Sequence, residues 1–104
     1  MSSILYLDVK DFTLVKTPSN QISVYNNIRG TSFILVSHKK CMKCSELIPN
    51  FKKLPGTLKN CQFGILDITY DRRFIEMVKN TILDIDYVPY MFICYNGLPI
   101  MEYK

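Results

Sequence analysis

The chain has 104 residues, of which 48% are hydrophobic and 12% aromatic, and its formal net charge is +4 at pH 7. This length predicts one domain over residues 1–104, with enough apolar side chains for a core without disulfide cross-links. No segment approaches the roughly 18 apolar residues of a membrane span, and the start of the chain lacks a secretory signal pattern. We therefore expect a cytoplasmic protein that contacts neither membranes nor, given its weak and scattered positive charge, nucleic acid.

Alanine is absent from the chain, whereas Ile, Lys, Asn and Tyr are abundant. These four residue types have AT-rich codons, so the bias is typical of an AT-rich genome. Large DNA viruses, parasites and some bacteria have such genomes. If the source is a large DNA virus, the virion becomes a second location to consider.

The first 30 residues are predicted to contain one strand and one short helix. Residues 4–9 alternate loosely between apolar and polar side chains and indicate a first strand. Thr17-Pro18 has the form of a helix start, because proline is favoured at the first helical position. We expect that helix to continue to about residue 27 and to stop before Gly30.

The middle of the chain predicts a buried strand followed by a helix. Residues 31–37 form a continuous apolar run of strand length, which suits a central strand buried on both faces. From Cys44 to Leu54 the apolar side chains recur with helical spacing and leave the charged side chains on the other face. We expect this helix to kink at Pro49 and to end at Pro55-Gly56.

The last part of the chain predicts two strands that form a hairpin, preceded by a strand and a helix. Residues 62–69 read as a strand, and Asp71 can cap the helix that follows. That helix would bury one face, made of Phe74, Ile75, Val78 and Ile82. Residues 91–95 and 98–103 flank Asn96-Gly97, a strong hairpin signal. Together these elements predict an α/β domain with one mixed sheet.

Cys41 and Cys44 form a CxxC pair where the apolar strand meets the following helix. A thiolate is the nucleophile in disulfide exchange, and the start of a helix favours negative charge. Lys39, Lys40 and Lys43 add positive potential at the same place. We expect Cys41 to attack a disulfide and Cys44, one turn later, to resolve the mixed disulfide.

The remaining cysteines, Cys61 and Cys94, lie in or near apolar runs and are expected to be inert buried thiols. One alternative joins His38, Cys41, Cys44 and Cys61 into a four-ligand zinc set. We expect Cys61 to lie at the far end of the sheet, out of reach of the other three. The sequence therefore predicts no metal and no other cofactor.

The run from Phe33 to Pro49 resembles the thioredoxin superfamily in having an apolar strand, a CxxC pair and a proline five residues after the second cysteine. Val88-Pro89-Tyr90, followed by an apolar strand and Asn96-Gly97, resembles that family's cis-proline segment and the hairpin after it. The resemblance covers roughly residues 31–103. It implies a thioredoxin-like fold, with a central mixed sheet of four to five strands flanked by helices and with Pro89 in the cis form.

The resemblance also implies a thiol–disulfide oxidoreductase that acts on protein or small-thiol disulfides. Its partners would be a protein disulfide substrate or a reductase. The Val88 backbone would offer strand-like hydrogen bonds to the substrate. Besides Cys41 and Cys44, the implied site residues are Val88, Pro89, Tyr90, Met42 and Lys43 for substrate binding, and Lys40 and His38 for tuning the ionisation of the cysteines.

The chain departs from the family pattern in several places. Lys40 stands where thioredoxins carry Trp, and Met42-Lys43 replaces Gly-Pro. Leu35 occupies the position of a buried acid, so proton transfer at Cys44 would rely on water or on His38. The sequence stops at Lys104, by the last strand, without the family's closing helix.

These departures keep a second interpretation open, in which the chain is a thioredoxin-fold structural or interaction protein with little redox activity. A viral assembly or virion component would be one example. The sheet face left open by the missing helix would then accept a partner or a second copy of the chain.

Overall fold

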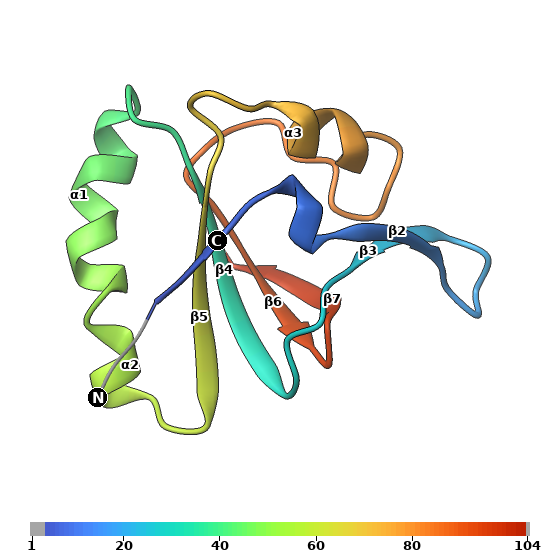
Figure 1. The fold of residues 1–104 in the computed structure, drawn as a ribbon, viewed down its shortest axis with the longest axis horizontal. Coiled ribbons are helices and arrows are strands. Elements are labelled where there is room, and N and C mark those ends of the chain that lie inside the picture. Colours follow the sequence, from blue (N-terminus) through green and yellow to red (C-terminus); the bar gives the residue numbers. More distant parts are fainter. Residues whose placement is uncertain (1–3, 104) are drawn as a thin grey trace.

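The computed structural model describes residues 4–103, so residues 1–3 and 104 of the expected single domain lie outside the described part. A five-stranded sheet in the order β1-β5-β4-β6-β7 forms the centre (Figure 1). β1 and β4 run parallel to β5, whereas β6 runs antiparallel to both β4 and β7. The predicted α/β class and mixed sheet are confirmed. The strands are β1 (Leu5–Leu7), β4 (Thr31–Ser37), β5 (Cys61–Asp67), β6 (Tyr90–Tyr95) and β7 (Leu98–Tyr103).

Helices lie on both faces of this sheet. One face is covered by α1 (Met42–Phe51) and the short α2 (Leu54–Thr57), and the other by α3 (Arg73–Val78). A 3-10 turn, η1 (Val9–Asp11), follows β1. None of the helices within residues 4–103 has both the length and the hydrophobicity that crossing a membrane requires.

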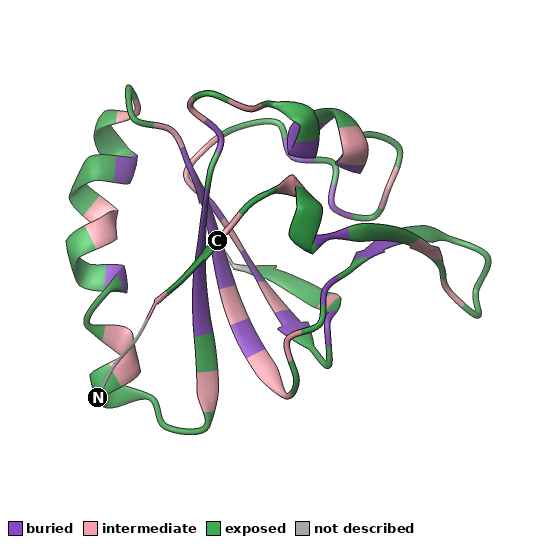
Figure 2. Cartoon of the chain, in the orientation of Figure 1, coloured by how far each residue is buried: buried purple, intermediate pink, exposed green. Residues whose placement is uncertain are grey.

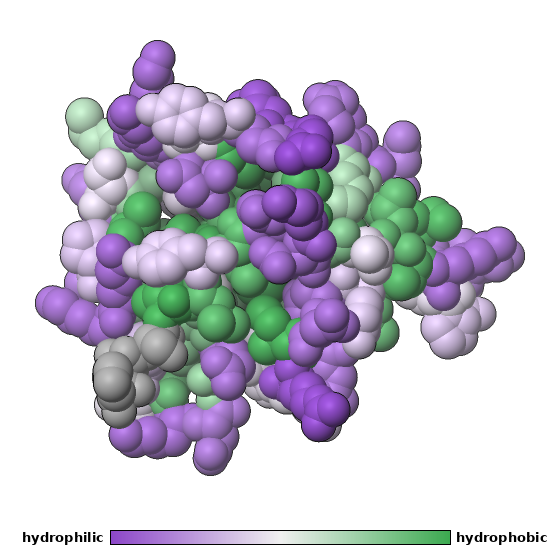
Figure 3. Space-filling model, in the orientation of Figure 1, coloured by the Kyte–Doolittle hydropathy of each residue, from purple (hydrophilic) through white to green (hydrophobic). Residues whose placement is uncertain are grey.

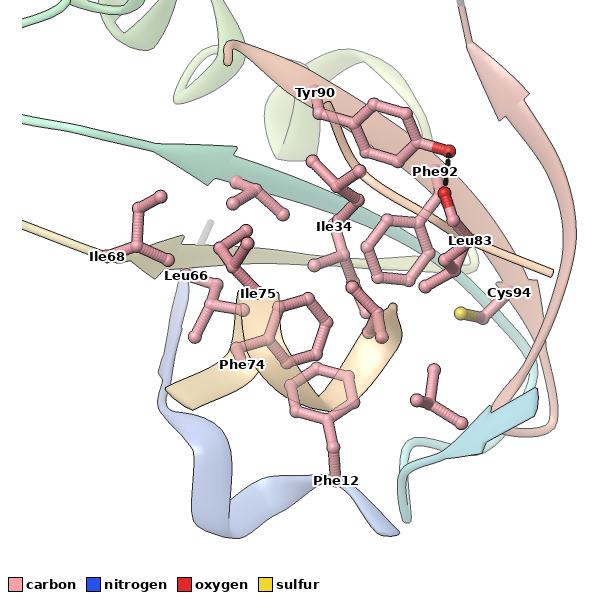
Figure 4. Close-up of a cluster of buried hydrophobic side chains, with 14 residues drawn as sticks. Phe12, Ile34, Leu66, Ile68, Phe74, Ile75, Leu83, Tyr90, Phe92 and Cys94 are labelled. Carbon is pink, nitrogen blue, oxygen red and sulfur yellow. Dashed lines mark hydrogen bonds between the residues drawn. The ribbon is translucent and has the colours of Figure 1, made fainter. Parts of the chain in front are cut away.

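The sheet separates two hydrophobic cores because alternate side chains of a strand point to opposite faces. Beneath α1, Leu35 packs with Phe51, Phe63 and Ile65. On the other face, Ile34 belongs to a larger core that α3 covers (Figure 4). Ile34, Leu35 and Val36 are fully buried, and Figure 2 shows burial concentrated in the central strands. The apolar run of β4 is thus buried on both faces, as predicted.

The helix expected between Thr17 and about residue 27 is wrong, because this segment belongs to a two-stranded hairpin. β2 (Thr13–Lys16) pairs antiparallel with β3 (Ile22–Tyr25). Thr17-Pro18 opens the turn between them, in which Thr17 N–H donates to the carbonyl of Gln21 and Asn20 adopts a positive φ of 72°. The hairpin forms because Val24 can then bury its side chain in the larger core, which outweighs the local helix-start signal.

The predicted end of the helix after Cys44 also differs. α1 continues through Pro49 and ends at Phe51, while Pro55-Gly56 lies inside α2. Pro55 sits in the first turn of α2, where its missing N–H removes no helical hydrogen bond, so it starts a second helix instead of ending the first.

The predicted α3 is correct in place but shorter than expected. Its N-cap is Arg72, and Asp71 contributes by accepting the backbone N–H of Arg73 at 3.0 Å. Ile82 lies beyond the end of the helix and is 46% exposed, so it is not part of the buried face. The Asn96-Gly97 turn forms as predicted, with positive φ at both residues.

Candidate dithiol site

Cys41 lies at the junction between β4 and α1, where it is the N-cap of the helix. The chain turns after β4 through a hydrogen bond from Cys41 N–H to the carbonyl of His38, at 3.0 Å. The Sγ of Cys41 accepts the backbone N–H of Cys44 at 3.1 Å. A sulfur atom therefore does here what Ser, Thr or Asp oxygens commonly do, which is to accept one of the unpaired N–H groups of the first turn.

Val88 is brought against Cys41 from 47 positions further along the chain. The thiol of Cys41 donates to the carbonyl oxygen of Val88, with the two atoms 3.6 Å apart. The Val88–Pro89 peptide bond is cis. Cys41 is half-buried and Val88 is half-buried, so the contact lies at the molecular surface.

Cys44 is fully buried under the first turn of α1. The pKa of its thiol is raised to about 11, mainly by burial and next by the side chain of Cys41, while the backbone of His38 acts in the opposite direction. The charge of Asp67 also contributes to raising this pKa. Cys44 therefore keeps its proton at neutral pH, and the pair consists of one accessible and one protected thiol.

The residues between the cysteines, and the two lysines directly before them, are exposed. Lys40 and Lys43 face solvent, and Met42 is 78% exposed. His38 is half-buried, and its Nδ1 accepts the backbone N–H of Lys40 at 3.0 Å. The structure thus places these four expected site residues around Cys41.

Tyr90 does not lie at this surface, although it was expected among the substrate-binding residues. Its side chain is only 6% exposed and belongs to the larger core. Its hydroxyl donates to the carbonyl of Leu83 at 3.3 Å, a bond drawn in Figure 4. A buried aromatic ring with a satisfied hydroxyl is a packing residue.

Asp67, Thr69 and Tyr70 form part of the site's surroundings and were not identified from the sequence. Asp67 accepts both the N–H and the hydroxyl of Thr69, whose oxygen accepts the backbone N–H of Lys39 at 2.8 Å. The Nζ of Lys39 donates to the hydroxyl of Tyr70 at 2.8 Å. Asp67 is the last residue of β5 and the other two follow it, and the carboxyl ends of neighbouring parallel strands meet at one edge of a sheet. That rule could have found them.

The other two cysteines lie away from the dithiol. Cys61 pairs with Thr31, at the opposite end of β4 from Cys41, so the proposed zinc set does not converge. Within residues 4–103, no three His, Cys, Asp or Glu side chains are grouped as metal ligands. Cys61 is half-buried, contrary to the expected burial, whereas Cys94 is fully buried and burial raises its pKa to about 11.

No protein-family model matches the chain. It is 38% identical to the uncharacterized protein 196R of Invertebrate iridescent virus 6, over 99% of this chain and 63% of that protein. It is 27% identical to the uncharacterized protein 020R of Invertebrate iridescent virus 3, over 92% of this chain and 59% of that protein. The chain therefore spans less than two thirds of the length of these curated relatives. Both are viral proteins, and large DNA viruses are among the sources that the residue composition of this chain indicates.

Several solved structures have a similar backbone. Thioredoxin F from spinach chloroplast, in its long form, matches with a TM-score of 0.69 over 98% of this chain and 74% of that chain, at 15% identity. The J-Trx1 fragment of ERdj5 matches with a TM-score of 0.65 over 97% of this chain and 42% of that chain, at 17% identity. At such low identity, this likeness concerns the fold.

Proposed function

Because this chain has a thioredoxin-like fold, we propose that it is a thiol–disulfide oxidoreductase whose reactive pair is Cys41 and Cys44. The observation that carries the proposal is the arrangement at the start of α1. A half-buried thiol caps the helix and contacts the Val88 carbonyl, and a buried thiol follows one turn later. This arrangement gives the two sulfur atoms different roles.

In the reducing direction, the thiolate of Cys41 attacks one sulfur of a substrate disulfide. The substrate S–S bond breaks, a Cys41–substrate S–S bond forms, and the leaving thiolate takes up a proton. Cys44 then loses its proton to solvent and attacks the Sγ of Cys41, which releases the second substrate sulfur as a thiolate. The substrate gains two electrons, and the dithiol becomes a disulfide that a thiol or dithiol reductant must reduce again.

The main chain at Val88 supports the binding of an extended substrate segment beside Cys41. Its carbonyl already receives the Cys41 thiol, so a substrate sulfur bonded to Cys41 would lie beside this backbone. Pro89 follows Val88 in the chain, and Met42 and Lys43 follow Cys41, so we propose these three residues as substrate contacts. Backbone pairing of this kind gives affinity with little dependence on the substrate's sequence.

The test is the equilibrium of the dithiol with glutathione redox buffers, read by alkylation of free thiols and mass spectrometry. The expected result is one disulfide between Cys41 and Cys44, with a defined midpoint. Cys41→Ser and Cys44→Ser should both abolish it, and Cys61→Ser should leave it unchanged. In a separate measurement near neutral pH, Cys41 should react with iodoacetamide faster than the other three cysteines. Equal reactivity of all four thiols in the folded protein would overturn the proposal.

A second candidate function, an interaction domain with little redox activity, is favoured by the edge strand β7. Ile100 and Met101 are 61% and 58% exposed there, a large apolar surface for one short strand. If this is the main role, Cys41→Ser would leave the protein's biological role intact. The oxidoreductase proposal requires that the same substitution abolish it.

A further inference from the structure

We infer that the dithiol site selects disulfides flanked by carboxylates, such as a cystine within an acidic protein segment. This inference rests on the proposed function and specifies its substrate class. Lys39, Lys40 and Lys43 all lie within three residues of Cys41, and all three are exposed. A disulfide that reaches the Cys41 sulfur therefore approaches a stretch of surface that carries three lysine side chains.

The three lysines carry charge that the protein itself does not neutralise. Across the part of the chain that the structure describes, the ion pairs join Arg73 to Asp71 and Lys79 to Glu76, and none includes these lysines. The first turn of α1 contains no acidic residue. The N-terminal end of that ten-residue helix adds its own positive potential at Cys41.

The loop that carries two of the lysines is held in place before a substrate arrives. The backbone N–H of Lys39 is bonded to Thr69, and its ammonium group to the hydroxyl of Tyr70. The backbone N–H of Lys40 is bonded to His38. Because these bonds already order the loop, less conformational entropy is lost when an anionic substrate binds to it.

The acidic side chains near the dithiol form no ion pair with these lysines within the described residues. Asp67 is engaged with Thr69, and Asp86 lines a hollow of about 140 Å³ together with Arg72 and His38. Glu46 lies a further turn along α1. Figure 3 shows hydrophilic residues gathered at the top of the view, over the β4–α1 loop and the start of α3. The surface around the dithiol is therefore polar, and its three lysines are not ion-paired within the described residues.

The selectivity should be expressed mainly in the rate of attack, because a charged rim steers an oppositely charged partner toward the site. The test uses three cystine peptides of equal length, in which the half-cystines are flanked by Glu, Gln or Lys. Two small disulfides are tested in the same way: glutathione disulfide, which carries carboxylates, and hydroxyethyl disulfide, which is neutral. The second-order rate constant for oxidation of the Cys41–Cys44 dithiol is measured by acid quench and alkylation.

At about 10 mM salt the Glu peptide should react at least about 10-fold faster than the Gln peptide, and the Lys peptide should be slowest. The ratio should shrink at 150 mM salt, where screening acts over about 8 Å. Lys40→Gln/Lys43→Gln should bring the Glu-to-Gln ratio close to one. The matched control, Lys16→Gln/Lys59→Gln, removes the same charge from exposed positions outside the β4–α1 loop and should preserve the ratio.

The outcomes separate the two proposals. Equal rates for the three peptides would overturn the selectivity and leave the oxidoreductase function standing. A dithiol that none of the disulfides oxidises would overturn the function, and the selectivity with it. The rate constant of glutathione disulfide can exceed that of hydroxyethyl disulfide by a factor similar to the one between the Glu and Gln peptides. Small anionic disulfides then belong to the substrate class. If only the Glu peptide is favoured, the substrate is an acidic protein segment.

Discussion

Asp67 lies directly opposite Ser37 at the paired ends of β5 and β4, where the chain leaves β4 toward Cys41. Along β5, Phe63 and Ile65 point to the face beneath α1, so Asp67 points to the same face by alternation. The acidic side chain is thus on the side of the sheet where Cys44 is buried. No sequence motif connects the two residues, and only the parallel pairing of the strands brings them to one edge.

We predict that Asp67→Asn lowers the pKa of Cys44. The carboxylate charge helps to raise this pKa to about 11, so its removal stabilises the thiolate. The amide oxygen can still accept the bonds from Thr69, which keeps the loop intact. Alkylation of Cys44 between pH 8 and 10, followed by mass spectrometry, should become faster. Asp71→Asn, on the same loop, is the control and should not change the rate, because Asp71 does not contribute to the shift.

A second prediction concerns Leu35, which is fully buried where the family resemblance implies an acid. Leu35→Asn and Leu35→Asp should each lower the free energy of unfolding by about 3 kcal/mol or more at neutral pH. Burial raises the pKa of the introduced carboxyl in the folded protein. The Asp variant is then most stable at low pH and loses stability as pH rises through that folded-state pKa. Urea unfolding from pH 4 to 8 should show this slope only for the Asp variant.

A third prediction compares two glycines with positive φ. A Cβ at Gly97 would clash with the carbonyl oxygen of Asn26, whereas a Cβ at Gly30 would meet nothing within 4 Å. Gly30→Ala should therefore cost only the backbone strain, about 1 kcal/mol. Gly97→Ala should cost clearly more, because the hairpin and the β6–β7 turn must separate. Equal losses in chemical denaturation would show that this close approach does not contribute to stability.

The fourth prediction is a loss of stability at alkaline pH. Burial raises the pKa of Cys44 and of Cys94 to about 11, and it also raises the pKa of Tyr90. A group whose pKa is higher in the folded state contributes its full stability below the unfolded-state value, which is 9.0 for Cys and 10.0 for Tyr. The contribution is lost as pH rises toward the folded-state pKa. The free energy of unfolding, measured with a reductant present, should fall between pH 8.5 and 11.

Tyr90→Phe provides the control for this alkaline effect. The variant should be less stable by about 1 kcal/mol at pH 7, because the carbonyl of Leu83 loses its hydrogen-bond donor. Above pH 10 its stability should fall less steeply than that of the unmodified protein. A steeper fall in the variant would contradict the assignment of the effect to Tyr90.

The elements with strong local patterns could be predicted from the sequence. The apolar run of β4, the helical spacing after Cys44 and the Asn96-Gly97 turn are signals that tertiary contacts did not override. The segment after Phe12 could not be predicted, because its choice between helix and hairpin depends on the burial of Val24 against distant parts of the chain. Local propensity is a weak guide where a long-range contact decides.

The site could be predicted where its residues are neighbours in sequence or match the family pattern, and not where long-range strand pairing brings them together. Cys41, Cys44 and the flanking residues are contiguous in sequence, and the family resemblance identified Val88-Pro89. Tyr90 was placed at the site by its position next to Pro89, but β6 alternation turns its side chain into the opposite core. Asp67 and Thr69 carry no motif, so their proximity depends on the strand order alone.

The β2–β3 hairpin also constrains how the chain can fold as it is synthesised. Asn26 N–H donates to the carbonyl of Gly97 at 3.1 Å, and Ile82 N–H donates to the carbonyl of Ile22 at 3.1 Å. The hairpin is thus held in part by segments that come much later in the chain. While Gly97 is still within the ribosome, the hairpin lacks this partner and Val24 lacks much of its core. The nascent chain should therefore acquire protease resistance late and in one step, after residues 90–97 have emerged.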